Sequence, residues 1–522
     1  MKKKKIVSLL MAALMIGQFL PSETMTAFAG ESALVGKEQL ADRHTVAPKK
    51  DSVVPNANQY EYQKQELAAF CHFGPNTFNE IEWGEKYGDK KPDEIFKLEE
   101  DFDADTFVEA IKEAGFEKLI VTAKHHDGFC IWNSKHTEYD VESTSYASKN
   151  YNGLGGDVLA EISAACTKED IDMGLYLSPW DIHEPSYGNN SPGDYNEFYN
   201  NQLKEILGNN KYGNGGKFVE IWMDGAKGGG ADPQDYTIDK WYETITKYEG
   251  EECLIFGAGP YASVRWIGNE NGEAADETWS KSILTEDNKI KNDPSQREDD
   301  FKGDPTDHFS NGYAEGNKWT VPEVDARITS GWFWGNGKST PKSMEQLANM
   351  YFSSVGRNAP LLLNIPPNNK GTVDDAILNR VKEFGNAVKE TFTNNIAAGK
   401  NVSCTASEVR GNDIAYSPNN VLDGNQDTYW TTDDKTEATE ATLEVNLGET
   451  KQFDVVSIEE AIKFGQRISE FKVEYKNGSD EWKVFGSGKT VGAKRLCRRS
   501  PVKADKLRIT VKTSEKAEHK AP

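Results

Sequence analysis

Short apolar runs alternate with amphipathic stretches along residues 60–392, and this rhythm constrains the fold of the chain more than any other feature. The runs that fit strands are 67–72, 118–123, 173–177, 217–223, 254–257, 326–333 and 361–365. The stretches that fit helices are 106–114, 158–167, 196–207, 238–248, 344–355 and 376–391. A strand-then-helix order repeated in this way favours an α/β fold, a parallel (β/α)8-like TIM barrel over residues 45–392, rather than a sandwich or a helical bundle.

The sixth strand of such a barrel is the weak point of the pattern. Residues 270–320 are polar, rich in Asp, Asn and Gly, and contain Asp293-Pro294 and Gly303-Asp304-Pro305. Because these sequences are typical of turns, we expect residues 270–320 to form largely long surface loops that shape the mouth of a site.

The pattern changes after residue 395. Alternating short segments at 441–447, 455–458, 471–475, 482–485 and 506–511 predict an all-β sandwich domain over residues 396–515. Within it, residues 421–430 read VLDGNQDTYW, which is similar to the signature of discoidin-like sandwiches. Whether this domain binds glycan or braces the barrel stays open.

The N-terminus has the layout of a secretory signal peptide. Lysines at positions 2–5 precede the apolar run 6–20, and Ala27-Phe28-Ala29 offers a cleavage site. The apolar run is shorter than the roughly 20 residues that a membrane-spanning helix needs. We therefore expect that residues 1–29 are removed, that the protein is secreted, and that no segment spans a membrane.

Charge and cysteine content exclude further classes of protein. The formal net charge is −24, and this excess of acid repels phosphate, so no nucleic acid partner is expected. The six Cys residues form no CxxC pair, which argues against a zinc ribbon and predicts buried thiols. A bridge between Cys404 and Cys497 stays open.

A carboxylate follows the predicted strand 217–223, where barrel enzymes display catalytic residues. Asp224 comes two residues after Trp222 and directly before a glycine, so a turn or a helix cap is its alternative role. Glu270, roughly one barrel unit later, supplies a second carboxylate, and a pair of this kind predicts glycoside hydrolysis. The competitors of Glu270 are Glu273, Glu277 and, less favoured, Glu323.

Imidazole, carboxylate and indole groups follow the first predicted strand. His72 comes directly after it, and Glu82 and Trp83 close the same loop. Sugars are bound by such a mixture, because their hydroxyls need directional hydrogen bonds while the C–H face of the ring packs on an aromatic ring. The set therefore predicts a sugar site.

His125, His126 and Asp127 follow the second predicted strand and raise the alternative of a metal site. Neighbouring residues of an extended strand point to opposite faces, and no HExxH spacing is present. We therefore expect hydrogen-bonding roles for the two histidines and no metal.

Eight blocks along residues 55–390 resemble, in their order, the α-L-fucosidases of glycoside hydrolase family 29. The blocks are HFGPNTF, EW, AKHHDGF, GLYLSPWD, EIWMDGA, RWIGNE, VPEVDARITSGWFW and VGRNAPLLLNIPP. The resemblance implies a catalytic barrel with a C-terminal β-sandwich, a retaining mechanism without metal or organic cofactor, and fucosylated oligosaccharides or glycoconjugates as partners. The GNE form resembles the subgroup that prefers α-1,3/1,4-linked fucose on branched glycans.

The resemblance also implies roles for single residues. Asp224 would be the nucleophile and Glu270 the general acid/base. The fucose-binding set that it implies comprises His72, Glu82, Trp83, His125, His126, Tyr176, Trp222, Arg265 and Trp332. Two alternatives remain open: a glycan-binding protein with weak catalysis, and a metal-dependent hydrolase that uses His125, His126 and Asp127.

Overall fold

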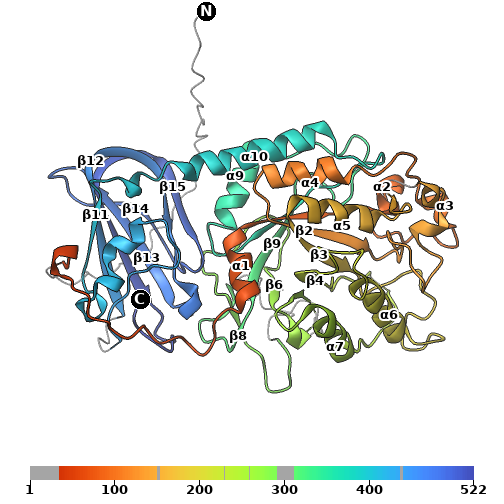
Figure 1. Ribbon diagram of the computed structural model, residues 1–522, viewed down its shortest axis with the longest axis horizontal. Coiled ribbons are helices and arrows are strands. Elements are labelled where there is room, and N and C mark those ends of the chain that lie inside the picture. The colour runs from red at the N-terminus through yellow and green to blue at the C-terminus, as the bar shows by residue number, and fades with distance from the viewer. Residues whose placement is uncertain (1–33, 150–152, 229, 258, 291–310, 435–438) are drawn as a thin grey trace, which may run out of the picture.

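The computed structural model describes residues 34–149, 153–228, 230–257, 259–290, 311–434 and 439–522, and the predicted signal peptide lies outside them. Two domains lie side by side, a barrel and an antiparallel sheet (Figure 1). Helix α10, Asp375–Thr393, is the last helix of the barrel and leads into the second domain.

Parallel strands close into a barrel in the order β1-β10-β9-β6-β5-β4-β3-β2, which confirms the predicted barrel. The strands are β1 Leu67–Cys71, β2 Lys118–Lys124, β3 Asp172–Leu177, β4 Glu220–Trp222, β5 Leu254–Phe256, β6 Val264–Trp266, β9 Val321–Arg327 and β10 Leu361–Asn364. Because all of them run in the same direction, the segments that follow their carboxyl ends meet at one rim.

Helices surround the barrel and bury their apolar faces against the outer side of the strands. They are α1 Ala57–Gln65, α4 Ala104–Glu113, α5 Val158–Glu169, α6 Tyr195–Leu207, α7 Ile238–Glu249, α9 Met344–Ser353 and α10, with α2 Pro75–Asn79 and α3 Pro92–Ile95 in the loop after β1. Asp103, Asp157 and Ser343 fix the starts of α4, α5 and α9, since each side chain accepts a hydrogen bond from the backbone three residues on.

The structure corrects the sequence prediction at two places. The strand predicted at 326–333 is wrong: β9 is Val321–Arg327, and Trp332 and Phe333 leave the sheet to pack against His72. The prediction of surface loops for 270–320 is wrong for part of this stretch, because Thr278, Trp279 and Ser280 are at most 1% exposed. The sixth strand, which the pattern did not reveal, is β6, just before Glu270.

The interior of the barrel holds a polar layer beneath the rim. Lys118 Nζ lies 2.7 Å from Glu220 Oε2, and both side chains are at most 1% exposed. The same ammonium group lies 3.0 Å from the centroid of the Tyr62 ring. Glu323 accepts hydrogen bonds from the Tyr62 hydroxyl and, at 2.9 Å, from Trp222 Nε1. These contacts pair buried charges and polar groups that would otherwise destabilise the core.

The second domain is an antiparallel sheet in the order β11-β12-β15-β13-β14, which confirms the predicted all-β domain. Its strands are β11 Ser403–Ala406, β12 Glu440–Ile458, β13 Ile468–Lys476, β14 Lys483–Gly488 and β15 Arg495–Thr513. Cys404 and Cys497 are free, buried thiols, as are the other cysteines. The segment before the barrel packs on this domain: Val35 pairs with Ala406, and Arg410 Nε donates to Val46 O at 2.9 Å.

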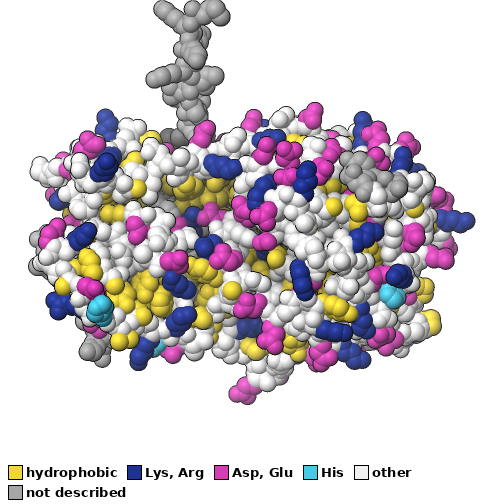
Figure 2. Space-filling model, viewed as in Figure 1, with side chains coloured by type: hydrophobic (Ala, Val, Ile, Leu, Met, Phe, Trp, Pro, Cys, Tyr) yellow, Lys and Arg dark blue, Asp and Glu magenta, His cyan; other side chains and the backbone are white. Residues whose placement is uncertain are grey.

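Acidic and basic side chains mix over the surface of both domains on the face that Figure 2 shows. Among the described residues, no helix has both the length and the apolar character that crossing a bilayer requires.

Candidate active site

Asp224 stands at the rim, two residues after the end of β4. The Tyr176 hydroxyl, from β3, donates to Asp224 Oδ2 at 2.9 Å, and the backbone N–H of Ala226 donates to Oδ1 at 2.8 Å. His126 Nε2 lies 3.6 Å from Oδ2, and the Asp224 side chain keeps 24% of its surface exposed. The carboxylate is thus fixed at both oxygens while it remains accessible from the rim.

His72 follows β1 and is held as a neutral imidazole. Its Nδ1 lies 2.8 Å from Asn364 Oδ1, and the amide nitrogen of Asn364 donates to Trp332 O at 2.7 Å. Since Asn364 Oδ1 can only accept, Nδ1 of His72 carries the proton and Nε2 is left as an acceptor. Burial lowers the pKa of His72 to about 3, so the ring carries no charge at neutral pH.

His125 and His126 follow β2, with their ring centroids 4.1 Å apart. Nδ1 of His126 lies 2.7 Å from Ser178 Oγ, which itself donates to Trp180 O at 2.7 Å. His126 Nδ1 is therefore the donor, and its Nε2, 3.6 Å from Asp224 Oδ2, is left as an acceptor without a hydrogen bond to that carboxylate. Burial lowers the pKa of both imidazoles. Nδ1 of His125 is buried without a hydrogen-bond partner among the described residues.

Aromatic rings wall the cluster on two sides. Trp83 meets the His126 ring edge-on at 5.8 Å between centroids, and Trp180 lies 4.9 Å from it. On the other side, Trp332 lies 5.0 Å from His72, and Phe333 packs against both His72 and His125. Polar groups between apolar walls are the composition of a sugar site. Trp180 was not predicted as a wall residue, although it lies within the block GLYLSPWD that the sequence marked.

Glu270 lies at the mouth beside an arginine from β9. Its Oε2 is 3.4 Å from Arg327 Nη2, and its side chain is 40% exposed. The Arg327 guanidinium lies 5.3 Å from the Trp332 ring centroid, which connects Glu270 to the aromatic wall. Glu82, an exposed residue, is also at the mouth: desolvation by its surroundings raises its pKa, while the charges of Arg327 and Glu270 act on it in opposite directions.

Asp325, two residues before Arg327, is a buried carboxyl whose pKa responds to both predicted catalytic groups. Trp266 Nε1 donates to its Oδ1 at 2.7 Å. Burial, together with the charges of Glu270 and Asp224, raises the pKa of Asp325 to about 8, so it is largely protonated at neutral pH. Asp325 was not among the residues that the sequence predicted for the site. Its signal was the spacing of two from Glu323, which puts both side chains on the same face of a strand.

The competitors of Glu270 have partners elsewhere. Glu273 forms an ion pair with Arg357 at 3.0 Å. Glu277 accepts a hydrogen bond from Trp279 Nε1 at 2.9 Å. Glu323 belongs to the buried layer beneath the site.

Two members of the expected fucose-binding set take different positions. Trp222 forms the floor of the site: its ring stacks on Tyr176 at 5.3 Å and on Phe256 at 3.8 Å between centroids, and it is 5% exposed. Arg265 alternates with Val264 and Trp266, which face the interior, and its guanidinium donates to Trp279 O at 2.6 Å on the outer side. The arginine that the structure brings to the mouth is Arg327.

Asp127 does not join the two histidines in a metal site. Its Oδ1 accepts from Phe129 N at 2.8 Å, and burial raises its pKa to about 7. Within the described part of the chain, the one group of three His, Cys, Asp or Glu residues whose ligand atoms come close enough for a metal is Asp51, Glu518 and His519. There Arg467 Nε lies 3.2 Å from Asp51 Oδ1, so a cation already faces this carboxylate.

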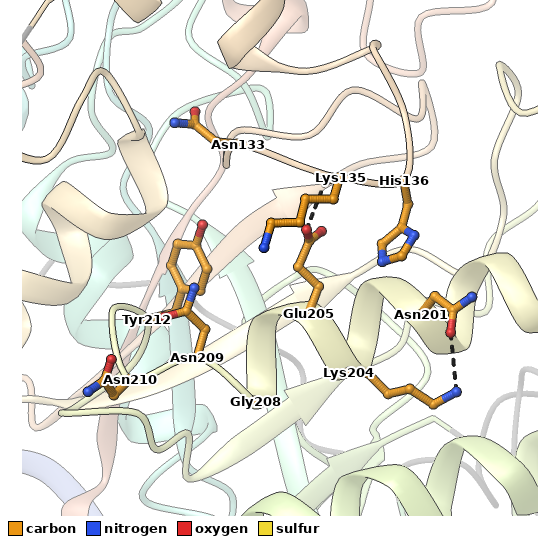
Figure 3. Close-up of a pocket in the computed structure, with 10 residues that line it drawn as sticks. All are labelled: Asn133, Lys135, His136, Asn201, Lys204, Glu205, Gly208, Asn209, Asn210 and Tyr212. Carbon is orange, nitrogen blue, oxygen red and sulfur yellow. Dashed lines mark hydrogen bonds between the residues drawn. The ribbon is translucent and has the colours of Figure 1, made fainter.

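A polar groove of about 740 Å³ lies away from this cluster, along α6 (Figure 3). It is lined by Asn133, Lys135, His136, Asn201, Lys204, Glu205, Gly208, Asn209, Asn210 and Tyr212. The Glu205 carboxylate accepts from Trp132 Nε1, Ser134 Oγ and Lys135 N, so it is occupied in fixing the neighbouring loop. None of the predicted site residues lines this groove.

Comparison with known proteins gives consistent matches to both domains. The family model for alpha-L-fucosidase matches residues 34–391, and that for the F5/8 type C domain matches residues 403–521. A solved structure of a Ruminococcus gnavus GH29 fucosidase in complex with fucose is 56% identical, with a TM-score of 0.87, and the match covers 94% of this chain and 97% of that chain. Alpha-L-fucosidase 1 of Arabidopsis thaliana is 39% identical over 447 residues, 85% of this chain and 81% of the relative.

Proposed function

The chain belongs to the alpha-L-fucosidase family of glycoside hydrolases, and we propose that it works by a retaining mechanism with Asp224 as nucleophile and Glu270 as general acid/base. The observation that carries this assignment is the carboxylate of Asp224, fixed by Tyr176 and Ala226 at the carboxyl end of β4. A nucleophile must be held in line with C1 of the sugar, and two hydrogen bonds give it that orientation.

In the first step, Asp224 attacks C1 of fucose, and the bond from C1 to the departing oxygen breaks. Glu270 donates its proton to that oxygen, so the leaving group departs as an alcohol. In the second step, Glu270 takes a proton from water, which attacks C1 and releases fucose and free Asp224. This sequence needs the two carboxyl groups about 5 Å apart.

The neutral imidazoles supply hydrogen bonds to the fucose hydroxyls. His72 and His126 each present Nε2 as an acceptor, and Nδ1 of His125 is without a partner among the described residues. Glu82 adds a carboxylate at the mouth, and Trp83 and Trp332 offer faces for the C–H groups of the sugar. Arg327, 3.4 Å from Glu270, stabilises negative charge on this group after it has given up its proton.

Variants at the two carboxylates test the mechanism. Asp224→Gly should lower kcat by a factor on the order of 10⁴ or more, and Glu270→Gln by about 10² to 10⁴ for glycan substrates. Glu273→Gln and Glu277→Gln replace the competing carboxylates and should lose far less activity than Glu270→Gln. Trapping with a 2-fluoro fucosyl fluoride should label the peptide that contains Asp224, as read by mass spectrometry. Full activity of Asp224→Gly would exclude the mechanism.

The substrates that we propose are branched glycans with α-1,3- or α-1,4-linked fucose. This rests on the GNE form of the segment that carries Glu270. Release of fucose should be compared between branched Lewis-type oligosaccharides and linear α-1,2-fucosylated ones. Equal rates on the two sets would exclude the linkage preference.

We also propose that the protein is secreted after loss of residues 1–29, on the basis of the lysine-rich start, the apolar run and the Ala27-Phe28-Ala29 site. N-terminal sequencing of protein recovered from the culture medium tests this. A start at Gly30 is the expected result, and retention of Met1 in cell-associated protein would contradict it.

A further inference from the structure

The chain that follows Glu270 forms a strap, residues 271–282, between the barrel and the C-terminal domain, and its second half, from Thr278 to Ser282, is buried. Near its start, the positive φ of 80° at Gly272 brings the backbone against α9: a Cβ there would lie 2.5 Å from Met350 Cγ. Thr278, Trp279 and Ser280 in its middle are at most 1% exposed. Apart from β7, Lys281–Ser282, the strap has no regular structure, so its buried backbone groups need other partners, and these partners decide where it lies.

The first part of the strap is anchored to the barrel. Asn271 pairs with Ala326 of β9, which places Glu270 beside Arg327. Further on, Ala274 N donates to Ser353 O at 2.8 Å, and Arg357 Nη1 donates to Ala274 O at 2.6 Å.

The second part of the strap is anchored to the C-terminal domain, at alternate residues. Arg495 Nη1 donates to Asp276 O at 2.8 Å, and its second terminal nitrogen pairs with the Asp276 carboxylate. The Thr278 N–H donates to Thr490 Oγ1 at 2.8 Å. Gln466 bonds the strap twice: Nε2 donates to Thr278 O at 2.9 Å, and Oε1 accepts from Ser280 N at 2.6 Å.

These anchoring side chains are themselves buried. Gln466, Thr490 and Arg495 are 0%, 1% and 5% exposed, so water cannot replace their hydrogen bonds without opening the junction between the domains. Asn358 of the barrel supports the same place: it donates to Thr278 O at 3.0 Å and accepts from Ala493 N at 2.7 Å. The strap therefore depends on both domains at once.

We propose that the C-terminal domain is part of the catalytic apparatus: Gln466, Thr490 and Arg495 are positioning residues that hold the strap and thereby keep Glu270 where it can transfer a proton to the leaving group. The proposal rests on the proposed role of Glu270. Since a misplacement of about 1 Å can cost a factor of about 100 in rate, small shifts of the strap should be visible in catalysis.

The test compares two substrates of the full-length enzyme, a fucosyl disaccharide and an aryl fucoside with a nitrophenolate leaving group. Only the disaccharide needs protonation of its leaving group, so a misplaced acid slows its cleavage selectively. Thr490→Val removes the hydroxyl oxygen that accepts from Thr278 but keeps the shape of the side chain, and Gln466→Leu removes both bonds of Gln466. Thr490→Ser keeps the hydroxyl and is the matched control.

For Thr490→Val with Gln466→Leu we expect kcat/KM for the disaccharide to fall by about tenfold to about 100-fold more than that for the aryl fucoside. Added azide should restore turnover of the aryl fucoside by the double variant, because azide needs no general base and replaces the water that Glu270 activates. The single variant Thr490→Ser, with Gln466 intact, should keep the wild-type ratio of kcat/KM between the two substrates. A second control is Arg498→Gln, which removes a contact to Asn349 at the domain junction without touching the strap and should leave the ratio unchanged.

Equal losses on both substrates, or no loss on either, would overturn the positioning role. Thr490→Val alone serves if the double variant does not fold. Glu270→Gln, measured in parallel, separates the two proposals: if it shows the selective loss and the strap variants do not, the strap proposal fails by itself. If Glu270→Gln lacks the selective loss, the acid/base assignment fails.

Discussion

The ion pair of Lys118 and Glu220 in the barrel interior allows a quantitative test of how the floor of the site is stabilised. The two groups are 2.7 Å apart and at most 1% exposed, so removing one partner leaves the other as an uncompensated buried charge. For Lys118→Met we expect the free energy of unfolding to fall by about 3–5 kcal/mol. Glu220 Oε1 has no hydrogen-bond partner among the described residues, so we expect the loss for Lys118→Met at the upper end of this range.

The loss for Glu220→Leu should be smaller. Lys118 Nζ still lies 3.0 Å from the centroid of the Tyr62 ring, and a desolvated cation–π contact offsets about 2 kcal/mol. We therefore expect a loss of about 1–3 kcal/mol. The double variant, with an apolar pair in place of the ionic one, should lose less than Lys118→Met alone.

Equilibrium unfolding in urea, followed by tryptophan fluorescence and circular dichroism, measures these differences. The matched control is the pair of Lys338 and Glu80, with a similar distance of 2.8 Å but side chains that are 69% and 36% exposed. Lys338→Met should cost far less than Lys118→Met, because water screens that pair. If the losses of Lys118→Met and Glu220→Leu simply add in the double variant, the two charges are not coupled and the reasoning is refuted.

Three further outcomes follow from the site. Asp325 has a raised pKa of about 8 in the folded protein, so the free energy of unfolding of the wild type should fall as pH rises from about 4 to about 8, by at most about 1.4 kcal/mol per pH unit. Over this window Asp325→Asn should become more stable relative to the wild type. Parallel pH profiles of stability for the two proteins would contradict the burial of a neutral carboxyl. Gly128→Ala should destabilise the protein and lower its activity, because φ at this position is 81° and a Cβ would lie 2.3 Å from Asp181 Oδ1. The Asp181 carboxylate pairs with Lys124. An unchanged temperature of thermal unfolding and an unchanged kcat would show that this loop tolerates the side chain. Dialysis against EDTA should leave fucose release unchanged, whereas a loss restored by added zinc would revive the metal-dependent alternative.

The rim residues were predictable because their signals are local. An apolar run ending in His72, in His125-His126 or in Trp222-Met223-Asp224 marks the carboxyl end of a strand, and parallel strands bring these ends to one rim. The barrel and the all-β domain follow from periodicity in the same way. These features depend on neighbours within a few residues, which the sequence displays directly.

Which way the side chains of β6 and β9 point could be seen only in the tertiary structure. A strand of three residues such as β6 has too few alternating positions for the sequence to fix which side faces inward, so Arg265 was expected in the site although its guanidinium lies on the outer side. For β9 the predicted strand began at residue 326, too late to include Asp325, and the sequence did not show that Arg327 faces the mouth of the site.

The strap is the feature that the sequence pattern predicted least. Thr278 and Thr490 are 212 positions apart, and Ser280 and Gln466 are 186 apart. Polar residues in a stretch rich in Asp, Asn and Gly are typical of exposed loops, and nothing local shows that a second domain will bury them. The sequence by itself determined which residues stand at the rim, and only the packing of the two domains decided how the segment that carries Glu270 is held, because that depends on buried hydrogen bonds between distant parts of the chain.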